Sequence, residues 1–177
     1  MPYSEPKTTP RRIEWRSFYE EFQNRSDRAS AIVGAAFLDG HLGHLMAAFL
    51  VDDPTEVAAL LGPDRPLGSF GAKIRAAYCM GLISPDEQHD LNLILQVQNT
   101  FAGEMSGISF EDERVRESCQ QLVFPGRVQL PGEQRSARNA FVFATALLAQ
   151  TLSLRALEAE ARRRVVPREY EFVPSGR

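Results

Sequence analysis

The stretch DRASAIVGAAFLDGHLGHLMAAFL, residues 27–50, decides the fold class of this chain. At 100° per residue its apolar side chains form two arcs around a helix. The arcs consist of Ile32, Val33, Ala36 and Leu50, and of Leu38, Leu42, Leu45 and Phe49. Only a narrow strip is left for water, at Ser30, His41 and Ala48. The pattern therefore predicts a helix over residues 27–51 that is buried on most sides and lies at the centre of a helical bundle.

One carboxylate interrupts this apolar helix. Asp39 projects between the two arcs, where an isolated charge is too costly to bury and must be paired. Lys73 and Arg75 are the only basic residues between Arg65 and Arg114. Because Lys73 flanks the apolar face of its own predicted helix, we expect it to pair with Asp39. Such a pair fixes the register of two helices or, alternatively, belongs to a ligand site.

Helical spacing recurs along the rest of the chain, and no stretch alternates as a strand would. The predicted helices cover residues 11–24, 27–51, 54–61, 69–80, 85–101, 110–122 and 133–164. Gly62 is expected as a left-handed C-cap, and Ser84 with Glu87 as a capping box. The segment FPGRVQLPG, residues 124–132, is expected to break the chain. These patterns predict an all-α, single-domain bundle of about seven helices.

The length of 177 residues suits one domain. We expect a flexible N-terminus over residues 1–10, a helical domain over 11–166 and a tail over 167–177. Two stretches, 29–51 and 139–154, are nearly free of charged residues, as membrane-spanning helices are. We interpret both as core helices, because Asp39 interrupts the first and the second is too short to span a membrane. The N-terminus has no apolar secretory segment, so a cytoplasmic location is the expectation.

The charges argue against direct binding of DNA. The net charge is −3 and the pI is about 5.7. Residues 29–124 hold 5 basic and 13 acidic residues, whereas residues 125–177 hold 9 basic and 5 acidic. The basic excess gathers near the end of the last predicted helix, where cations complement the helix dipole. No basic recognition helix of a helix-turn-helix motif accompanies it.

No catalytic motif stands out in the sequence. Cys79 and Cys119 have no CxxC partner and are expected to be buried, reduced thiols. His41 and His44 are three residues apart, but no further metal-ligand pattern accompanies them, so we interpret them as surface residues. Phosphate-loop and nucleophile-elbow sequences are absent. We therefore expect no enzyme activity, no cofactor and no metal.

Four segments taken in order resemble the mannitol operon repressor family. They are DRASAIVGAAFLDGHLGHLMAAFL (27–50), GSFGAKIRAAYCMGLIS (68–84), LILQVQNTFAG (93–103) and SFEDERVRESCQQL (109–122). The resemblance implies an all-helical, cytoplasmic bacterial protein that regulates transcription of sugar-alcohol genes without a recognisable DNA-binding motif. Such a repressor-like protein acts through a protein partner, here unidentified, and by analogy forms homo-oligomers.

The same region is more distantly similar to HEPN helical domains, whose nuclease members carry an RNxxxH motif. With Asn99 aligned to the asparagine of that motif, Gln98 takes the place of the arginine and Gly103 that of the histidine. Cleavage of RNA needs a cation and an acid or base, which neither residue supplies. This resemblance implies an inactive scaffold in which Asn99 makes a structural hydrogen bond or caps the helix end. The alternative functions are thus an RNA-associated or toxin–antitoxin component without catalysis, and a small-ligand sensor built around Asp39 and Lys73.

Overall fold

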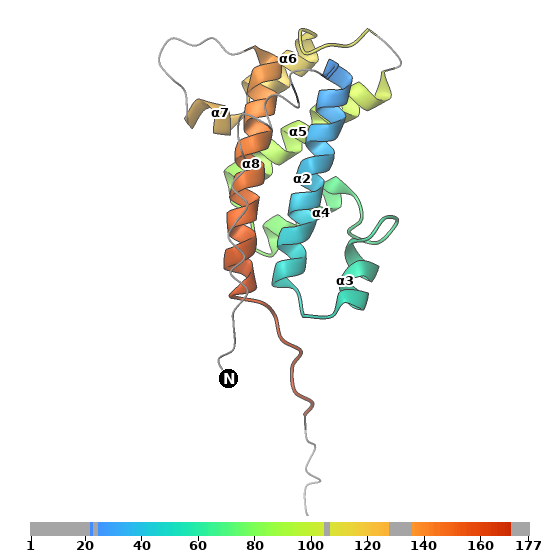
Figure 1. Cartoon of the computed structure of the whole chain (residues 1–177), viewed down its shortest axis with the longest axis vertical. Coiled ribbons are helices and arrows are strands. Elements are labelled where there is room, and N and C mark those ends of the chain that lie inside the picture. Colours follow the sequence, from blue (N-terminus) through green and yellow to red (C-terminus); the bar gives the residue numbers. More distant parts are fainter. Residues whose placement is uncertain (1–21, 23–24, 105–106, 128–135, 171–177) are drawn as a thin grey trace, which may run out of the picture.

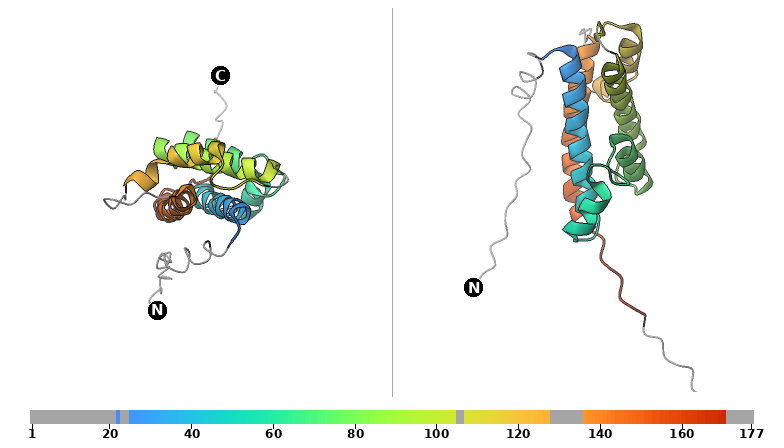
Figure 2. Two further views of the ribbon diagram at one scale, coloured as in Figure 1. Left: turned by 90° about the horizontal axis from the view of Figure 1, so that it is seen from above. Right: turned by 90° about the vertical axis from the view of Figure 1, so that its right-hand side faces the viewer.

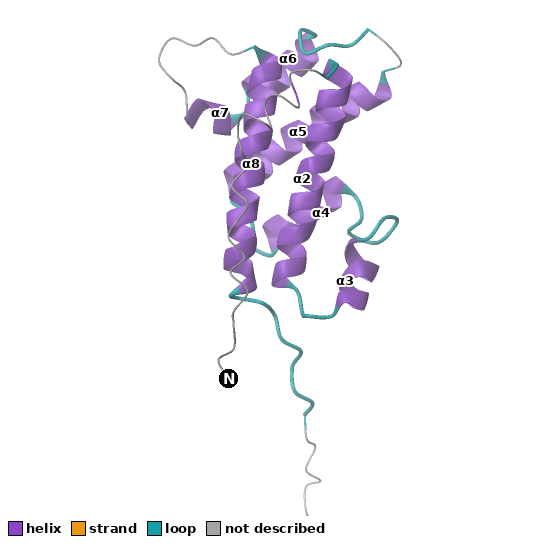
Figure 3. Cartoon of the chain, viewed as in Figure 1, coloured by secondary structure: helices purple, strands orange, loops and turns teal. Residues whose placement is uncertain are grey.

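The computed structural model describes residue 22 and residues 25–104, 107–127 and 136–170 of the chain. Within these residues the chain forms helices and no strands, as predicted (Figures 1 and 3). The helices are α2 (Asp27–Phe49), α3 (Pro54–Leu61), α4 (Phe70–Cys79), α5 (Pro85–Gly103), α6 (Glu113–Gln120), α7 (Val123–Arg127) and α8 (Ala137–Glu160). The helix predicted over residues 11–24 lies outside the described residues, apart from Phe22.

The helices pack in two layers. The long helices α2 and α8 lie side by side in one layer, and α5 lies with α4 and α6 in the other (Figure 2). The largest buried side chains come from both layers and fill the space between them. They are Leu38, Leu42, Leu45, Met46, Ile74, Leu91, Ile94, Phe101, Phe110, Phe141, Leu148 and Leu152. Helix α2 packs against α4, α5 and α8, which confirms its predicted central position.

The sides of α2 differ from the prediction. Ile32 is 37% exposed and Ala36 is exposed as well, so part of this apolar arc faces outward, whereas Val33 packs against the core. Ser30 and Ala48, which were expected in contact with water, are buried. Ser30 and Ala48 are buried because α8 packs closely against their side of α2, where the residues are small. A Cβ atom added to Gly34 on this side would lie 2.9 Å from Cε1 of Phe141.

Both α2 and α8 are long and apolar enough to cross a membrane, judged by length and composition alone. Each carries an ionised side chain that pairs with a charge on another helix of the bundle. Asp39 of α2 pairs with Lys73, and Arg155 of α8 pairs with Glu87. These pairings favour the interpretation of both as core helices.

Several helix ends follow from local sequence. Ser84 accepts a hydrogen bond from the backbone N–H of Glu87, whose carboxylate accepts one from Ser84 in return, so the predicted capping box is present. Asp53 caps α3 through its side chain. The expected left-handed cap at Gly62 is wrong, because its φ is −66°. The positive φ after α4 falls at Gly81, at +69°.

Two predictions about the last third of the chain need correction. The expected break at residues 124–132 is wrong where it begins, because Val123–Arg127 forms the short helix α7. The last helix begins at Ala137, capped by Ser136, and ends at Glu160 rather than Arg164. Its predicted start at Glu133 lies outside the described residues.

Candidate functional site

The structure brings Asp39 and Lys73 together between α2 and α4. The Lys73 Nζ atom lies 2.9 and 3.0 Å from the two carboxylate oxygens of Asp39, and 3.3 Å from the carbonyl oxygen of Gly68. An ammonium group has three N–H donors, so these contacts use them all. Arg75 is exposed on α4 and takes no part in the pair. The pair ties two helices together, and its role in binding a ligand stays a prediction.

Two further acidic side chains are more deeply buried, both on α5. Glu87 is 1% exposed, and Arg155 donates a hydrogen bond of 2.7 Å to its Oε1 atom. Asp90 is fully buried, and its two carboxylate oxygens accept hydrogen bonds of 2.9 Å from the backbone N–H groups of Val123 and Phe124. Asp90 therefore caps α7, which explains why a segment containing Pro-Gly begins as a helix.

A basic residue of α8 holds the chain that precedes α2. Arg138 donates to the carbonyl oxygens of Phe22 and Arg25, at 2.7 and 2.5 Å, and to Ser30 Oγ at 3.1 Å. It also forms an ion pair with Asp27. Every one of these partners lies more than 100 residues away in the sequence, so local pattern gives no sign of the cluster.

Burial shifts the pKa of three titratable groups. It raises the pKa of Asp90, and the two backbone hydrogen bonds offset only part of that shift. It lowers the pKa of His41, against the opposing effect of a contact with the carbonyl oxygen of Phe37. It raises the pKa of the Cys119 thiol to about 12, so this thiol stays protonated. Cys79 was expected to be buried but is exposed, because it closes α4 at the surface.

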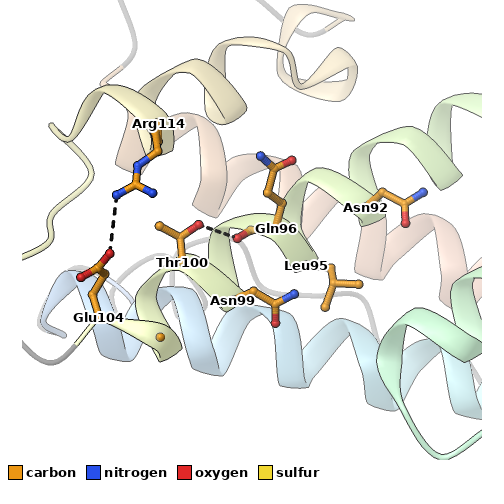
Figure 4. A pocket seen from close by; sticks show the side chains of 8 residues that line it. Asn92, Leu95, Gln96, Asn99, Thr100, Glu104 and Arg114 are labelled. Carbon is orange, nitrogen blue, oxygen red and sulfur yellow. Dashed lines mark hydrogen bonds and ion pairs between the residues drawn. The ribbon is translucent and has the colours of Figure 1, made fainter.

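A shallow groove of about 520 Å³ lies where the outer face of α5 meets α6. It is lined by Asn92, Leu95, Gln96, Asn99, Thr100, Gly103, Glu104 and Arg114. Asn92, Gln96 and Asn99 follow one another on one face of α5, and all three residues are exposed (Figure 4). We call this the amide groove. Sequence reasoning identified Asn99 and Gly103 within it but missed the other two amides.

The end of the amide groove is held by charged contacts. Arg114 lies 3.5 Å from the carboxylate of Glu104, and both side chains are largely exposed (Figure 4). Arg28 donates to the backbone carbonyl of Glu104 at 2.5 Å. The hydroxyl of Thr100 donates to the carbonyl oxygen of Gln96 within α5. Arg114 is the only basic residue in the lining and has an acidic partner, so the groove is close to neutral.

The positions aligned with the nuclease motif do not form one cluster. Asn99 and Gly103 line the amide groove, whereas Gln98 is half-buried and lies outside its lining. The amide of Asn99 makes no hydrogen bond to the described part of the chain, and the cap of α5 is Glu104. The structural hydrogen bond expected of Asn99 is therefore not observed there. Across the described ranges, no three His, Cys, Asp or Glu residues gather as metal ligands would.

A solved structure shares the fold of this chain. No family model and no curated protein matches the sequence. Among solved structures, the chain is similar to MtlR in the X-ray structure of the MtlR–HPr complex from Escherichia coli. The TM-score is 0.64 and the sequence identity 17%, over 78% of this chain and 96% of that chain. The chain has the fold of MtlR.

This likeness confirms, for the fold, the resemblance to the mannitol operon repressor family that the sequence segments show. The two chains share an arrangement of helices, but at 17% identity most of their side chains differ. The structure of MtlR was solved with HPr, a second protein.

Proposed function

We propose that this protein is a non-enzymatic, cytoplasmic regulator that acts by binding a partner protein, and that the amide groove is its docking surface. The observation that carries the proposal is the match in fold to MtlR, whose structure is that of a complex with HPr. We propose further that the protein regulates a carbohydrate operon, such as one for the use of mannitol. This part of the proposal rests on the resemblance between the sequence segments.

The chemistry of the amide groove suits a protein surface. Each carboxamide both donates and accepts hydrogen bonds, so a row of three matches the N–H and C=O groups of a loop or sheet edge in a partner. Leu95 adds an apolar contact between the amides. The side chains of Asn92 and Gln96 are exposed, and within the described chain neither forms a hydrogen bond that the fold requires. They are free to bind a partner without loss of internal contacts.

The neutral lining argues against the alternative of RNA binding at this site. Affinity for nucleic acid comes mainly from cations that contact phosphates. The groove holds one cation, Arg114, which already faces Glu104. Likewise, Lys73 has no free donor for a phosphate or sugar, which weakens the case for a ligand sensor at the Asp39 pair.

Capture from the host lysate tests the proposal. The tagged full-length chain is used as bait, and purified HPr from the same host is titrated as the first defined candidate. We expect a stoichiometric protein partner on the native chain and much weaker capture by Gln96→Arg, which places a bulky cation in the groove.

A matched control is available on α6. Gln120 is exposed and lies outside the groove lining, so Gln120→Arg makes the same chemical change elsewhere. We expect this control to retain the partner. If native chain, Gln96→Arg and Gln120→Arg all retain the same partner equally, the groove assignment is wrong. If the native chain retains no specific partner, the proposed function is wrong.

A further inference from the structure

The segment after α8 begins at a fixed point on the bundle. The backbone N–H of Arg164 donates to the carbonyl oxygen of Phe49 at 2.8 Å, and its guanidinium lies 5.0 Å from the centre of the Phe49 ring. Arg163 lies 3.4 and 3.5 Å from the carbonyl oxygens of Ala47 and Leu50. These two arginines satisfy the C-terminal end of α2, so the chain leaves the bundle in a defined direction.

Beyond this point the chain presents apolar side chains to solvent. Val165, Val166 and Tyr170 are 84%, 73% and 87% exposed, more than any other large apolar residue that the structure describes. The segment leaves the bundle at the lower end in Figure 1. We call residues 162–170 the C-terminal arm.

Beyond Arg164, the sequence of the arm disfavours a return of the arm onto its own chain. Val165 and Val166 are β-branched, which favours extended backbone, and a residue that precedes proline is biased away from the helical conformation. Pro167 itself lacks a backbone N–H and has a fixed φ. A tight reversal immediately after Arg164 is therefore disfavoured.

Helix α3 offers a complementary surface at the same end of the molecule (Figures 1 and 2). It has no buried residue, and Val57 and Leu60 remain half-exposed. The segment 52–65 holds four acidic residues and one basic, whereas the arm holds four basic residues and one acidic. Formal net charges of −3 and +3 thus belong to two segments at one end of the bundle.

The attraction between these segments is already visible where the arm begins. Arg163 lies 3.7 Å from the carboxylate of Asp52, just before α3. The remaining acidic residues, including Glu56 and Asp64, are exposed. They have no basic partner among the described residues.

We propose that two copies of this chain dimerise by exchanging C-terminal arms, each arm binding helix α3 of the other copy. Val165 and Val166 cover Val57 and Leu60, while the arginines of the arm face the acidic residues around α3. The contact is reciprocal, so one two-fold axis satisfies both arms and both α3 surfaces. The proposal does not depend on the amide groove, which belongs to α5 and α6.

The oligomeric state of the full-length chain tests this. Mass photometry and sedimentation are run across a wide range of protein concentration at low and high salt. We expect a dimer that weakens with salt, and a dissociation constant raised by at least about tenfold in Val165→Asp/Val166→Asp. Arg116→Glu, on the exposed surface of α6, is the control for an added negative charge and should leave the dimer intact.

A charge exchange distinguishes direct contact from indirect effects. Arg168→Glu and Glu56→Arg should each weaken the dimer, and the two changes together should restore it in part. A native chain that is monomeric at all concentrations overturns the proposal, as does a dimer unaffected by the two aspartates. A monomer whose arm instead binds anionic vesicles or nucleic acid overturns it too.

Discussion

Helix α5 buries two carboxylates on one face and exposes three carboxamides on the other. On its inner face, Glu87 and Asp90 are buried, and Glu87 binds Arg155 of α8 while Asp90 binds the start of α7. On its outer face, Gln96 and Asn99 are exposed and line a groove. A polar side chain whose hydrogen bonds are completed within the chain stabilises the fold, whereas one left open to solvent is available to a partner. Substitutions on the two faces should therefore have different consequences.

The largest effect is expected at Asp90. Replacing Asp90 with Ala leaves the partly buried backbone N–H groups of Val123 and Phe124 without their acceptor, and should lower the free energy of unfolding by about 3 kcal/mol. Urea denaturation measures the change. Asp86→Ala is the control on the same helix: Asp86 pairs with Arg127 at the surface, so about 0–1 kcal/mol is expected. Equal effects of the two substitutions would contradict the structural role of Asp90.

The next effect concerns the charge of Glu87. Replacing Arg155 with Met leaves this carboxylate buried without its cation and should cost about 2 kcal/mol, less than for a fully buried pair because Arg155 is partly exposed. Adding Glu87→Gln to this variant removes the stranded charge, and the double variant should recover part of the loss. The same urea titrations provide the measurement. A double variant less stable than the sum of both single changes would contradict this account.

A smaller effect is the pH dependence due to Asp90. Because burial raises its pKa in the folded state, the folded chain retains a proton at pH values where the unfolded chain has lost it. Stability contributed by this group is therefore highest below the ordinary aspartate pKa and falls as pH rises through the raised value, by at most about 1.4 kcal/mol per pH unit. The measurement is urea denaturation of the native chain and Asp90→Asn at a series of acidic pH values. A stability difference in favour of the native chain that grows with pH would show that the pKa is lowered instead.

The smallest effect on stability is expected on the outer face. Replacing Gln96 and Asn99 together with Ala removes no hydrogen bond within the described fold, so the free energy of unfolding should change by less than about 0.5 kcal/mol. Alanine also has the higher helix propensity. A loss well above 1 kcal/mol in the same urea assay would place these amides among the structural residues.

The helices and one ion pair could be predicted from the sequence, because helix caps involve neighbouring residues and the ion pair had few candidate partners. Ser84 and Glu87 form a capping box within four residues, and their hydrogen bonds are those expected. Asp39 had only two basic candidates in the segment between Arg65 and Arg114, and the nearer to the apolar face, Lys73, is its partner. In both cases the chemistry restricts the choices before any long-range arrangement is known.

Other features depend on contacts that no local pattern encodes. The partners of Asp90 are backbone groups 33 and 34 residues further along the chain, which carry no side-chain signature. A helical projection of α2 shows two apolar arcs but not that α8 packs against the side that carries Ser30 and Gly34, and so the pattern places Ile32 inside and Ser30 outside. The amides of Gln96 and Asn99 are typical of any exposed helix face until the position of α6 turns that face into a groove.

We propose that the inner face of α5 maintains the fold while its outer face binds a partner. The most direct test measures partner affinity by calorimetry, at a temperature where both proteins are folded, for Asp90→Ala and for Gln96→Ala/Asn99→Ala. We predict that Asp90→Ala retains the native affinity and that the double amide variant binds at least about tenfold more weakly, with its stability unchanged. Native affinity in the double amide variant would contradict the assignment of the partner site to the outer face of α5.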